Sequence, residues 1–416
     1  METCMKVIGI DWAQAVHDVC LLAPDGSVVE RWRAPHDAEG VRKLLARMER
    51  EGGPTAVLVG IESGAPLLLD QLLAAGYTVY ALNPKVADRM RDRHSIAGAK
   101  DDTLDAYVLA DAVRTERGRF RPVARDSDLA EEIRARDRAR SRRVQERARL
   151  QNQLRDVLRR YYPVLLDLDR PMTDRFLLEL LTKYPEPAKA QGARVATLEK
   201  LLASHRIRVL KAAELAERLR APALVCSVPV ASACRDEAVD LAAQITLLSS
   251  QIEAADAALE ALLERHPDRK ILRSLPGLGD CLAVRVIAEL GDSRDRFADR
   301  SSLQSFCGSA PVTRRSGKGR PRVAMRKGCN RVLQAALYAM ARASRARSAW
   351  ARAYYDSYVA RGGRKGAAAR ALSNKWAKII WTLLRTGEVY AEAKHLATLK
   401  AYGVPWVKDV RVPEAA

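Results

Sequence analysis

The sequence predicts an α/β domain followed by a mostly helical remainder. Three short apolar runs separated by turn residues open the chain, and alternating helix and strand patterns follow up to about residue 125. A heptad pattern later covers residues 241–262, and the patterns after it are those of amphipathic helices. A chain of 416 residues is long enough for two or three domains. We expect them at residues 1–125, 126–266 and 267–416.

The first elements follow the order βββαβαβ. Strands are expected at residues 5–12, 16–23, 27–32, 55–62 and 77–82. Helices are expected at residues 37–51 and 65–75. A strand meander followed by alternating helices and strands predicts a mixed sheet covered by helices, and ribonuclease-H-like nucleases are one of the few folds with this order.

Four carboxylates stand at the ends of these elements. Asp11 lies late in the first predicted strand and Glu62 ends the fourth, both among apolar residues that normally exclude a charge. A further helix, expected to run to about Arg114, opens with Asp102 and Asp105 on one face. Four converging carboxylates need cations to stay ionised and suit Mg²⁺ or Mn²⁺. Each acid alone is better explained by a solvated helix or a turn, whereas the four together in this order favour a metal site.

The middle of the chain is predicted to be helical and contains eight arginines within residues 134–149. Such a helix could lie along a phosphate backbone, or it could serve only as a spacer. The later heptad seam consists of Leu241, Ile245, Leu248, Ile252, Ala255, Leu259 and Leu262. The two helical segments could pair with each other as an antiparallel coiled coil or pair between subunits. Residues 166–235 are predicted to form short helices and turns between them.

A tight turn and a long acid-free stretch mark the C-terminal part. Pro276-Gly277-Leu278-Gly279 precedes a predicted helix, as in helix-hairpin-helix DNA-binding units, although a plain turn explains it equally well. No Asp or Glu occurs from Arg300 to Tyr355. The basic residues expected to contact nucleic acid there are Arg314, Arg315, Lys318, Arg320, Arg322, Arg326, Lys327 and Arg331. Ser316 among them could grip a phosphate or attack its phosphorus, and chemistry alone favours gripping. Amphipathic helices are expected at residues 330–347 and 367–384, with Trp376 and Trp381 in the core.

The composition indicates a polyanionic partner. Lys and Arg number 71 against 51 Asp and Glu, which gives a net charge of +20. The sequence has neither an apolar run of membrane-spanning length nor a signal-peptide pattern, so we expect a cytoplasmic protein with no membrane partner. Seven cysteines without a CxxC pair suit reduced thiols and give zinc no support. Aromatic residues make up 5% of the chain, which argues against base stacking as the main binding mode.

The whole chain resembles transposases of the DEDD insertion-sequence group, the IS one-ten family. Ile8-Gly9-Ile10-Asp11, Glu62-Ser63-Gly64 and the run from Lys100 to Ala106 are similar to the RuvC-like domain of that family. Pro276-Gly277-Leu278-Gly279, Arg296-Phe297, the turn from Gly308 to Pro311 and Arg315-Ser316-Gly317 resemble its second domain. Asp101, Ser309 and Ala310 depart from the family pattern at positions without a proposed catalytic role.

The resemblance implies a recombinase that cuts and rejoins donor and target DNA. It places the catalytic metal ligands on Asp11, Glu62, Asp102 and Asp105 and the nucleophile on Ser316. It also implies a bridge RNA that guides site choice, and we expect a homo-oligomer, a dimer or a tetramer. Two alternatives stay open: a metal-dependent nuclease or junction resolvase that activates water while Ser316 grips phosphate, and a non-catalytic nucleic-acid-binding protein.

Overall fold

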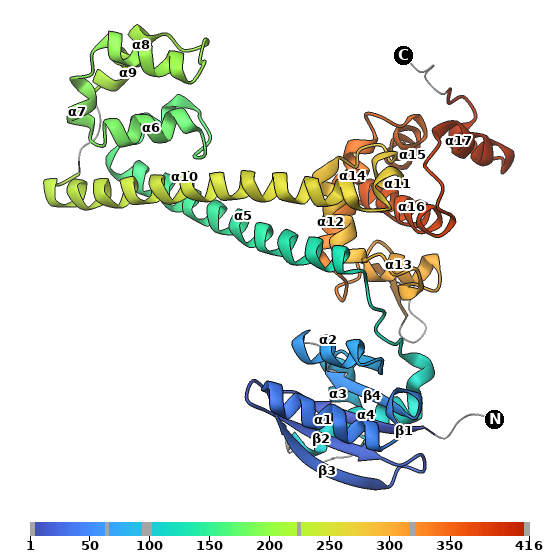
Figure 1. The fold of residues 1–416 in the computed structure, drawn as a ribbon. Coiled ribbons are helices and arrows are strands. Elements are labelled where there is room, and N and C mark those ends of the chain that lie inside the picture. The colour runs from blue at the N-terminus through green and yellow to red at the C-terminus, as the bar shows by residue number, and fades with distance from the viewer. Residues whose placement is uncertain (1–4, 63–65, 94–101, 223–225, 316–321, 412–416) are drawn as a thin grey trace. The chain divides into compact units, whose positions relative to one another are not determined.

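The computed structural model describes residues 5–62, 66–93, 102–222, 226–315 and 322–411. The chain forms two compact units, one of Met1–Asp126 with Ser293–Ala298 and one of Ser127–Asp292 with Asp299–Ala416. The first unit contains a mixed sheet and the second is mostly helical (Figure 1), so the predicted fold class is confirmed. The finer division into three domains remains a proposal.

A five-stranded sheet of order β3-β2-β1-β4-β5 forms the centre of the first unit. Its strands are β1 (Lys6–Asp11), β2 (Val16–Leu22), β3 (Val28–Pro35), β4 (Val57–Glu62) and β5 (Thr78–Leu82). The first three strands form an antiparallel meander, whereas β1, β4 and β5 run parallel. The predicted βββαβαβ order is thereby confirmed.

Helices cover both faces of this sheet. They are α1 (Ala38–Arg50), α2 (Pro66–Ala74), α3 (Pro84–Arg91) and α4 (Asp102–Glu116). Side chains alternate along each strand, so β1 sends Ile8 and Ile10 to the core under α1 and α2 and sends Val7 to the core under α3 and α4. Each fully buried aliphatic side chain contributes about 1.5–3 kcal/mol to such a core.

Two long helices, α5 (Asp128–Tyr161) and α10 (Val228–Arg265), lie side by side in the second unit (Figure 1). Arg140 pairs with Asp256, and Arg147 Nη1 donates to Ser249 Oγ at 3.2 Å. Partner numbers fall along α10 as they rise along α5, so the pair is antiparallel. The α10 seam therefore packs against α5 within the chain, which is one of the two arrangements that the sequence left open.

The remaining helices fall into two groups. As predicted, short helices lie between the arms: α6 (Arg175–Lys183), α7 (Pro187–Gln191), α8 (Val195–Ser204) and α9 (Ala212–Arg220). The C-terminal group comprises α11 (Arg269–Arg273), α12 (Asp280–Leu290), α13 (Arg300–Phe306), α14 (Arg331–Ser344), α15 (Ala349–Ala360), α16 (Lys365–Thr386) and α17 (Glu392–Ala401). Trp376 is buried as expected and its Nε1 donates to Ser344 Oγ at 2.9 Å. Trp381 is only half-buried, which corrects its expected core position.

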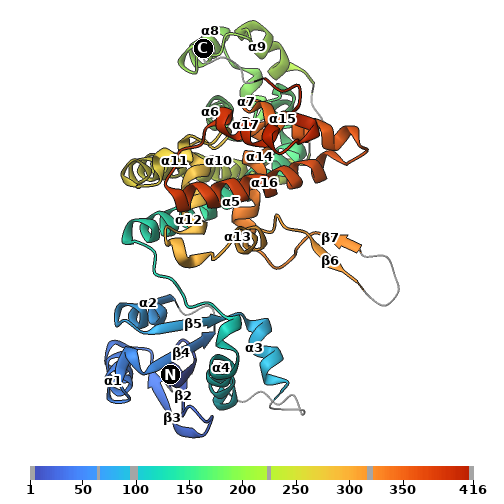
Figure 2. The same cartoon turned by 90° about the vertical axis from the view of Figure 1, so that its right-hand side faces the viewer.

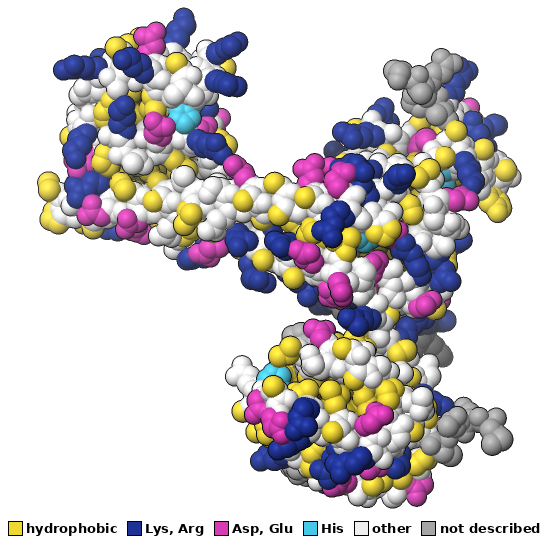
Figure 3. All heavy atoms as spheres, viewed as in Figure 1, with side chains coloured by type: hydrophobic (Ala, Val, Ile, Leu, Met, Phe, Trp, Pro, Cys, Tyr) yellow, Lys and Arg dark blue, Asp and Glu magenta, His cyan; other side chains and the backbone are white. Residues whose placement is uncertain are grey.

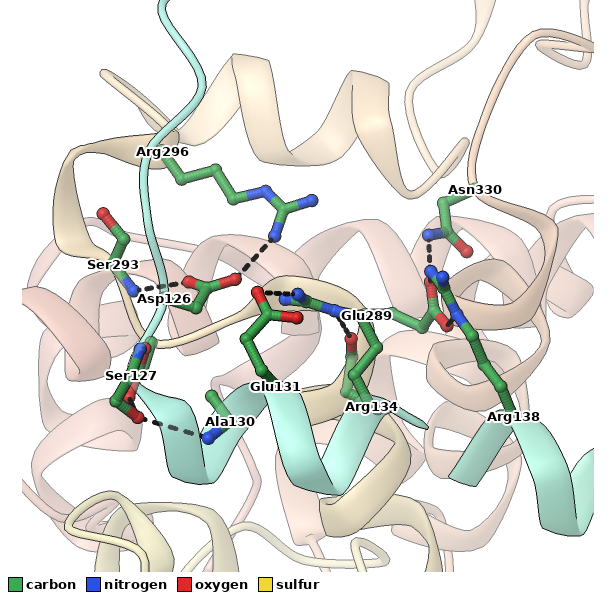
Figure 4. Close-up of polar contacts among 12 residues, drawn as sticks. Asp126, Ser127, Ala130, Glu131, Arg134, Arg138, Glu289, Ser293, Arg296 and Asn330 are labelled. Atoms are coloured by element: carbon green, nitrogen blue, oxygen red, sulfur yellow. Dashed lines mark hydrogen bonds and ion pairs between the residues drawn. The ribbon is translucent and has the colours of Figure 1, made fainter. Parts of the chain in front are cut away.

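A short hairpin of β6 (Val312–Arg314) and β7 (Arg322–Ala324) projects from the C-terminal helices (Figure 2). The segment 293–298 belongs to the first unit because Asp126 holds it: Ser293 N donates to Oδ1 at 3.0 Å, and Arg296 Nη1 lies 3.3 Å from Oδ2 (Figure 4). In the described ranges, no helix is both long and apolar enough to cross a membrane. The cysteines in those ranges are all free.

Candidate active site

Asp11 and Glu62 end neighbouring parallel strands. In the register of β1 and β4, Ile10 lies opposite Ile61, so the residues that follow them reach the same edge of the sheet. Asp11 and Glu62 also point to the same face, because the preceding Ile10 and Ile61 both point into the opposite core. The strand register thus brings two of the four predicted acids together.

Helix α4 crosses the sheet on the face of these two acids, and two glycines allow its approach. A Cβ on Gly9 would lie 1.9 Å from the Ala106 carbonyl oxygen, and one on Gly60 would lie 2.6 Å from the Leu109 carbonyl oxygen. Any side chain at either position would push the helix away from the sheet. This close contact places Asp105, the residue before Ala106, over β1.

Asp105 is 7% exposed and forms an ion pair with Arg91 of α3. Arg91 Nε donates to Asp105 Oδ1 at 2.5 Å, and Arg91 Nη1 also lies 2.9 Å from Asp88 Oδ1. The hydrogen bond to Asp105 is the main cause of the raised pKa of Arg91. The buried carboxylate is therefore compensated by a guanidinium.

The expected metal ligands can be tested against these positions. Asp11, Glu62 and Asp105 supply carboxylate oxygens, the chemistry that Mg²⁺ and Mn²⁺ prefer. Among the side chains that the structure describes, however, no three from His, Cys, Asp and Glu lie close enough together to hold a metal ion. Asp102 begins α4, but its side chain lies outside the described set. The acids share a face without forming a ligand cluster in this arrangement.

A fifth acid, Asp18, escaped the sequence reasoning. It lies directly opposite Asp11 in the antiparallel pair of β1 and β2, so it shares the face covered by α4. Asp18 is 9% exposed, and Arg33 Nε donates to its Oδ1 at 3.1 Å. The sequence feature that could have identified Asp18 is its charge within the apolar run of residues 16–22. In the neighbouring residue His17, the Nε2 atom lies 2.9 Å from Nδ1 of His36. Burial lowers the pKa of His17.

The basic stretch that contains Ser316 is centred on the β6–β7 hairpin. Arg314 pairs with Arg322 across the two strands through the backbone. Ser316, Lys318 and Arg320 lie between these strands in sequence and fall outside the described residues. Of the other residues predicted to contact nucleic acid, Arg315, Lys327 and Arg331 are exposed and Arg326 is half-buried. Figure 3 shows further Lys and Arg side chains over the arm with α6–α9 and over the C-terminal helices.

A buried acid ties the base of this hairpin to the long helices (Figure 4). Glu289 of α12 is 4% exposed; Arg138 of α5 lies 3.3 Å from its Oε1, and Asn330 Nδ2 donates to its Oε2 at 2.5 Å. Asn330 also caps α14, because its Oδ1 accepts from Leu333 N at 3.0 Å. Arg134 Nε donates to the Ala288 carbonyl at 2.7 Å. Sequence spacing gave no sign of this network.

Six of the eight arginines in residues 134–149 of α5 have partners within the protein. Arg134, Arg138, Arg140 and Arg147 contact α12 or α10. Two others pair with acids on their own helix, Arg136 with Glu132 and Arg149 with Glu146. These contacts give the arginine-rich helix a structural role within the chain, and its contact with a phosphate backbone stays a prediction.

The Pro-Gly turn before α12 also has a structural explanation. Gly277 adopts φ +82°, and a Cβ there would lie 2.6 Å from Ser344 N. Asp280 occupies the first turn of α12 and pairs with Arg273 at 2.7 Å. The carboxylate of an acid at a helix N-terminus already compensates the partial positive charge that would attract a phosphate. The plain-turn explanation therefore accounts for these residues.

Comparison with known proteins identifies relatives over most of the chain. Residues 8–163 match a family model described as a transposase, and residues 269–356 match one described as the transposase IS116/IS110/IS902 family. The mini-circle transposase candidate for IS117 of Streptomyces coelicolor is 36% identical, with 94% of this chain and 96% of that protein covered. The uncharacterized 42 kDa protein of insertion element IS900 of Mycobacterium paratuberculosis is 27% identical over 92% of this chain and 97% of that protein. The T. thermophilus RuvC structure with a Holliday junction substrate aligns at a TM-score of 0.23 and 17% identity, covering 29% of this chain and 99% of that one.

Proposed function

Because the chain belongs to the IS116/IS110/IS902 family of transposases, we propose that it cuts and rejoins DNA with both of its units. The first unit would contribute the carboxylates and the second the serine of the basic hairpin. The observation that supports this assignment best is the placement of Asp11, Glu62 and Asp105 on the one sheet face covered by α4. Charges are costly among apolar strands, so three acids on one face favour a function that uses their charge.

Asp11, Glu62, Asp102 and Asp105 are the residues that would hold Mg²⁺ or Mn²⁺. When bound, such an ion stabilises the charge that develops on a phosphodiester under attack. The protein residues set where this happens: the strand register fixes Asp11 beside Glu62, and the two glycines fix the height of α4. Asp105 Oδ1 is bound to Arg91, so this oxygen would be available to a metal ion only where the ion pair opens.

Ser316 is the proposed nucleophile. Its Oγ forms a bond to the phosphorus while one deoxyribose oxygen leaves, and the serine proton ends on that oxygen. Attack by the hydroxyl of another DNA strand on the phosphoserine then restores a phosphodiester and frees the serine. The number of phosphate ester bonds is unchanged, so rejoining needs no external energy source. Arg315 and its basic neighbours would neutralise the charge on the pentacoordinate phosphorus.

The partners follow from the family and the charge. Donor and target DNA are the proposed substrates, and a net charge of +20 suits both duplexes. We also propose that a bridge RNA selects the sites and that the working form is a homo-oligomer. These two proposals rest on the family alone.

The test compares two variants with matched controls, using DNA that contains the element ends. Asp11→Asn should abolish recombination and keep nucleic-acid binding within about twofold, because only ligand charge is lost. Ser316→Ala should bind DNA yet form no covalent protein–DNA adduct on a denaturing gel. Asp25→Asn, at an exposed turn of the first unit, and Ser301→Ala, on exposed α13, should behave as wild type.

Each variant has an outcome that would overturn its assignment. Normal recombination by Asp11→Asn would remove the metal site, and a covalent adduct with Ser316→Ala would place the nucleophile elsewhere. Metal-dependent cleavage without any adduct in the wild-type chain would identify a water-activating nuclease. Binding without cleavage under all metal conditions would identify an architectural DNA-binding protein.

A further inference from the structure

We infer that the C-terminal helices bind one unpaired nucleotide of a single-stranded nucleic acid. The site is a pocket of about 450 Å³ between α15, α16 and α17, within the second unit. This volume lies within the range of small-ligand pockets. The inference rests on the proposed nucleic-acid function but is independent of the assignment of Ser316.

Aromatic rings form much of the pocket wall. Trp350 lies at its base with ring centroids 4.8 Å from His395 and 6.5 Å from Trp406. Trp350 Nε1 donates to the Tyr390 hydroxyl at 2.6 Å, and that hydroxyl lies 2.7 Å from Glu392 Oε2. The polar atoms of these two rings are thus used within the protein, which holds the rings in place. Trp350 itself is 1% exposed, so the half-buried rings of His395 and Trp406 are the ones that can stack against a base.

The rim of the pocket is basic. Its lining contains Arg300, Lys375, Lys378 and Lys394 against a single acid, Glu388, which pairs with Lys394 at 2.7 Å. Burial and the neighbouring Lys378 both lower the pKa of Lys375, so a bound anion would relieve a charge that the protein itself leaves poorly stabilised. Basic side chains around an aromatic pocket complement a phosphate attached to a stacked base.

The distribution of aromatic residues also favours this site. Four of the six tryptophans of the chain lie within residues 350–406, although aromatics make up only 5% of its residues. Two of them, Trp350 and Trp376, are buried and explained by the core, whereas Trp406 is half-buried in the pocket wall. Tyr402 lies beside it and is 80% exposed. The Tyr402 ring is therefore open to a ligand at the pocket.

A single strand is the required form of the ligand. A base in a duplex is stacked and paired, so it enters a pocket only after its unpairing costs a few kcal/mol. An unpaired stretch of RNA and a displaced DNA strand present the same chemistry, a free base with a flanking phosphate. The experiment separates these two sources.

The test measures binding of the full chain to fluorescent single strands of uridine nucleotides, of thymidine nucleotides, and to a blunt DNA duplex. Trp406→Ala should weaken single-strand binding about tenfold, and Trp406→Phe should retain most of it, because stacking needs a ring. The double variant Lys375→Gln/Lys378→Gln should also reduce the slope of log affinity against log salt by about 1.4. Lys400→Gln, at an exposed position of α17 outside the lining, is a control that removes a single charge.

A loss of affinity for the RNA strand, for the DNA strand or for both supports the pocket. The strand that is affected identifies whether the ligand is RNA, DNA or either. Unchanged single-strand binding by both the Trp406→Ala and the lysine variants would overturn the proposal, as would an equal loss on the duplex. The lysines are exposed, so their replacement tests the site even if Trp406→Ala unfolds. Losses found in a chain that never forms a covalent DNA adduct would refute the serine mechanism and leave this pocket intact.

Discussion

At the scale of single residues, two cations could compensate the charge of Asp105: the Arg91 guanidinium and a metal ion. In the structure its carboxylate is bound to Arg91, whereas the proposed chemistry needs it on a metal ion. Both partners are largely buried, and removal of Arg91 would leave the acid uncompensated at a cost of about 2 kcal/mol. A metal ion would recover that cost, and it would no longer have to displace the guanidinium.

We therefore predict that Arg91→Gln lowers the melting temperature without divalent ions and increases the stabilisation gained from Mg²⁺ or Mn²⁺. Thermal unfolding across a metal titration measures both effects. Arg42→Gln, which breaks an exposed pair with Glu39, should change neither. Equal metal-induced stabilisation of Arg91→Gln and wild type would show that Arg91 does not compete with a metal.

Single site residues could be predicted from the sequence only where the evidence lay within a few residues of them. Asp11 and Glu62 stood out because each interrupts an apolar strand, and this context lies within a few residues of each acid. Asp18 had the same context but becomes a neighbour of Asp11 only through the register of β1 and β2. The partner of Asp105 lies 14 residues earlier on another helix, at a separation that no periodicity specifies.

At the scale of elements, the sequence pattern predicted where helices and strands lie, but it did not predict which elements pair with each other. The apolar runs of β1 and β4 and the amphipathic patterns of the helices predicted their bounds within a few residues. β3 extends to Pro35, beyond the predicted end at residue 32, because an edge strand with mostly exposed side chains lacks a clear apolar pattern. The heptads of α10 predicted a partner helix but could not specify α5, since any apolar seam satisfies them equally.

The β6–β7 hairpin leads to a prediction at this scale. Replacing Arg320, Arg322 and Arg326 with Ala should reduce the slope of log affinity against log salt for duplex DNA by up to about 2.7, since each lost phosphate contact removes about 0.9. Fluorescence anisotropy over a range of salt concentrations measures the slope. Replacing Arg136, Arg149 and Arg159, which pair with acids on α5 itself, is the matched control and should change the slope less. An unchanged slope for the hairpin variant would remove it from the interface.

At the scale of the whole molecule, the proposed chemistry is divided between the two units. The first unit provides Asp11, Glu62 and Asp105, whereas the acid-free stretch from Arg300 to Tyr355 provides Ser316 without a carboxylate ligand of its own. The proposed metal ligands thus belong to the first unit and the proposed nucleophile to the second. The proposed reaction therefore needs the two units to meet, either within one chain or between copies in an oligomer.

Mixing two inactive variants distinguishes these arrangements. A chain with Asp11→Asn retains the serine and a chain with Ser316→Ala retains the carboxylates, so a site shared between copies is complete in part of a mixed oligomer. We predict that co-expression of the two variants restores recombination to roughly a tenth to a half of the wild-type level, whereas each variant alone stays inactive. Excision from a plasmid with the element ends gives the readout, and a tag on one variant shows that mixed oligomers form. Mixed oligomers without activity would mean that each chain builds its site from its own two units.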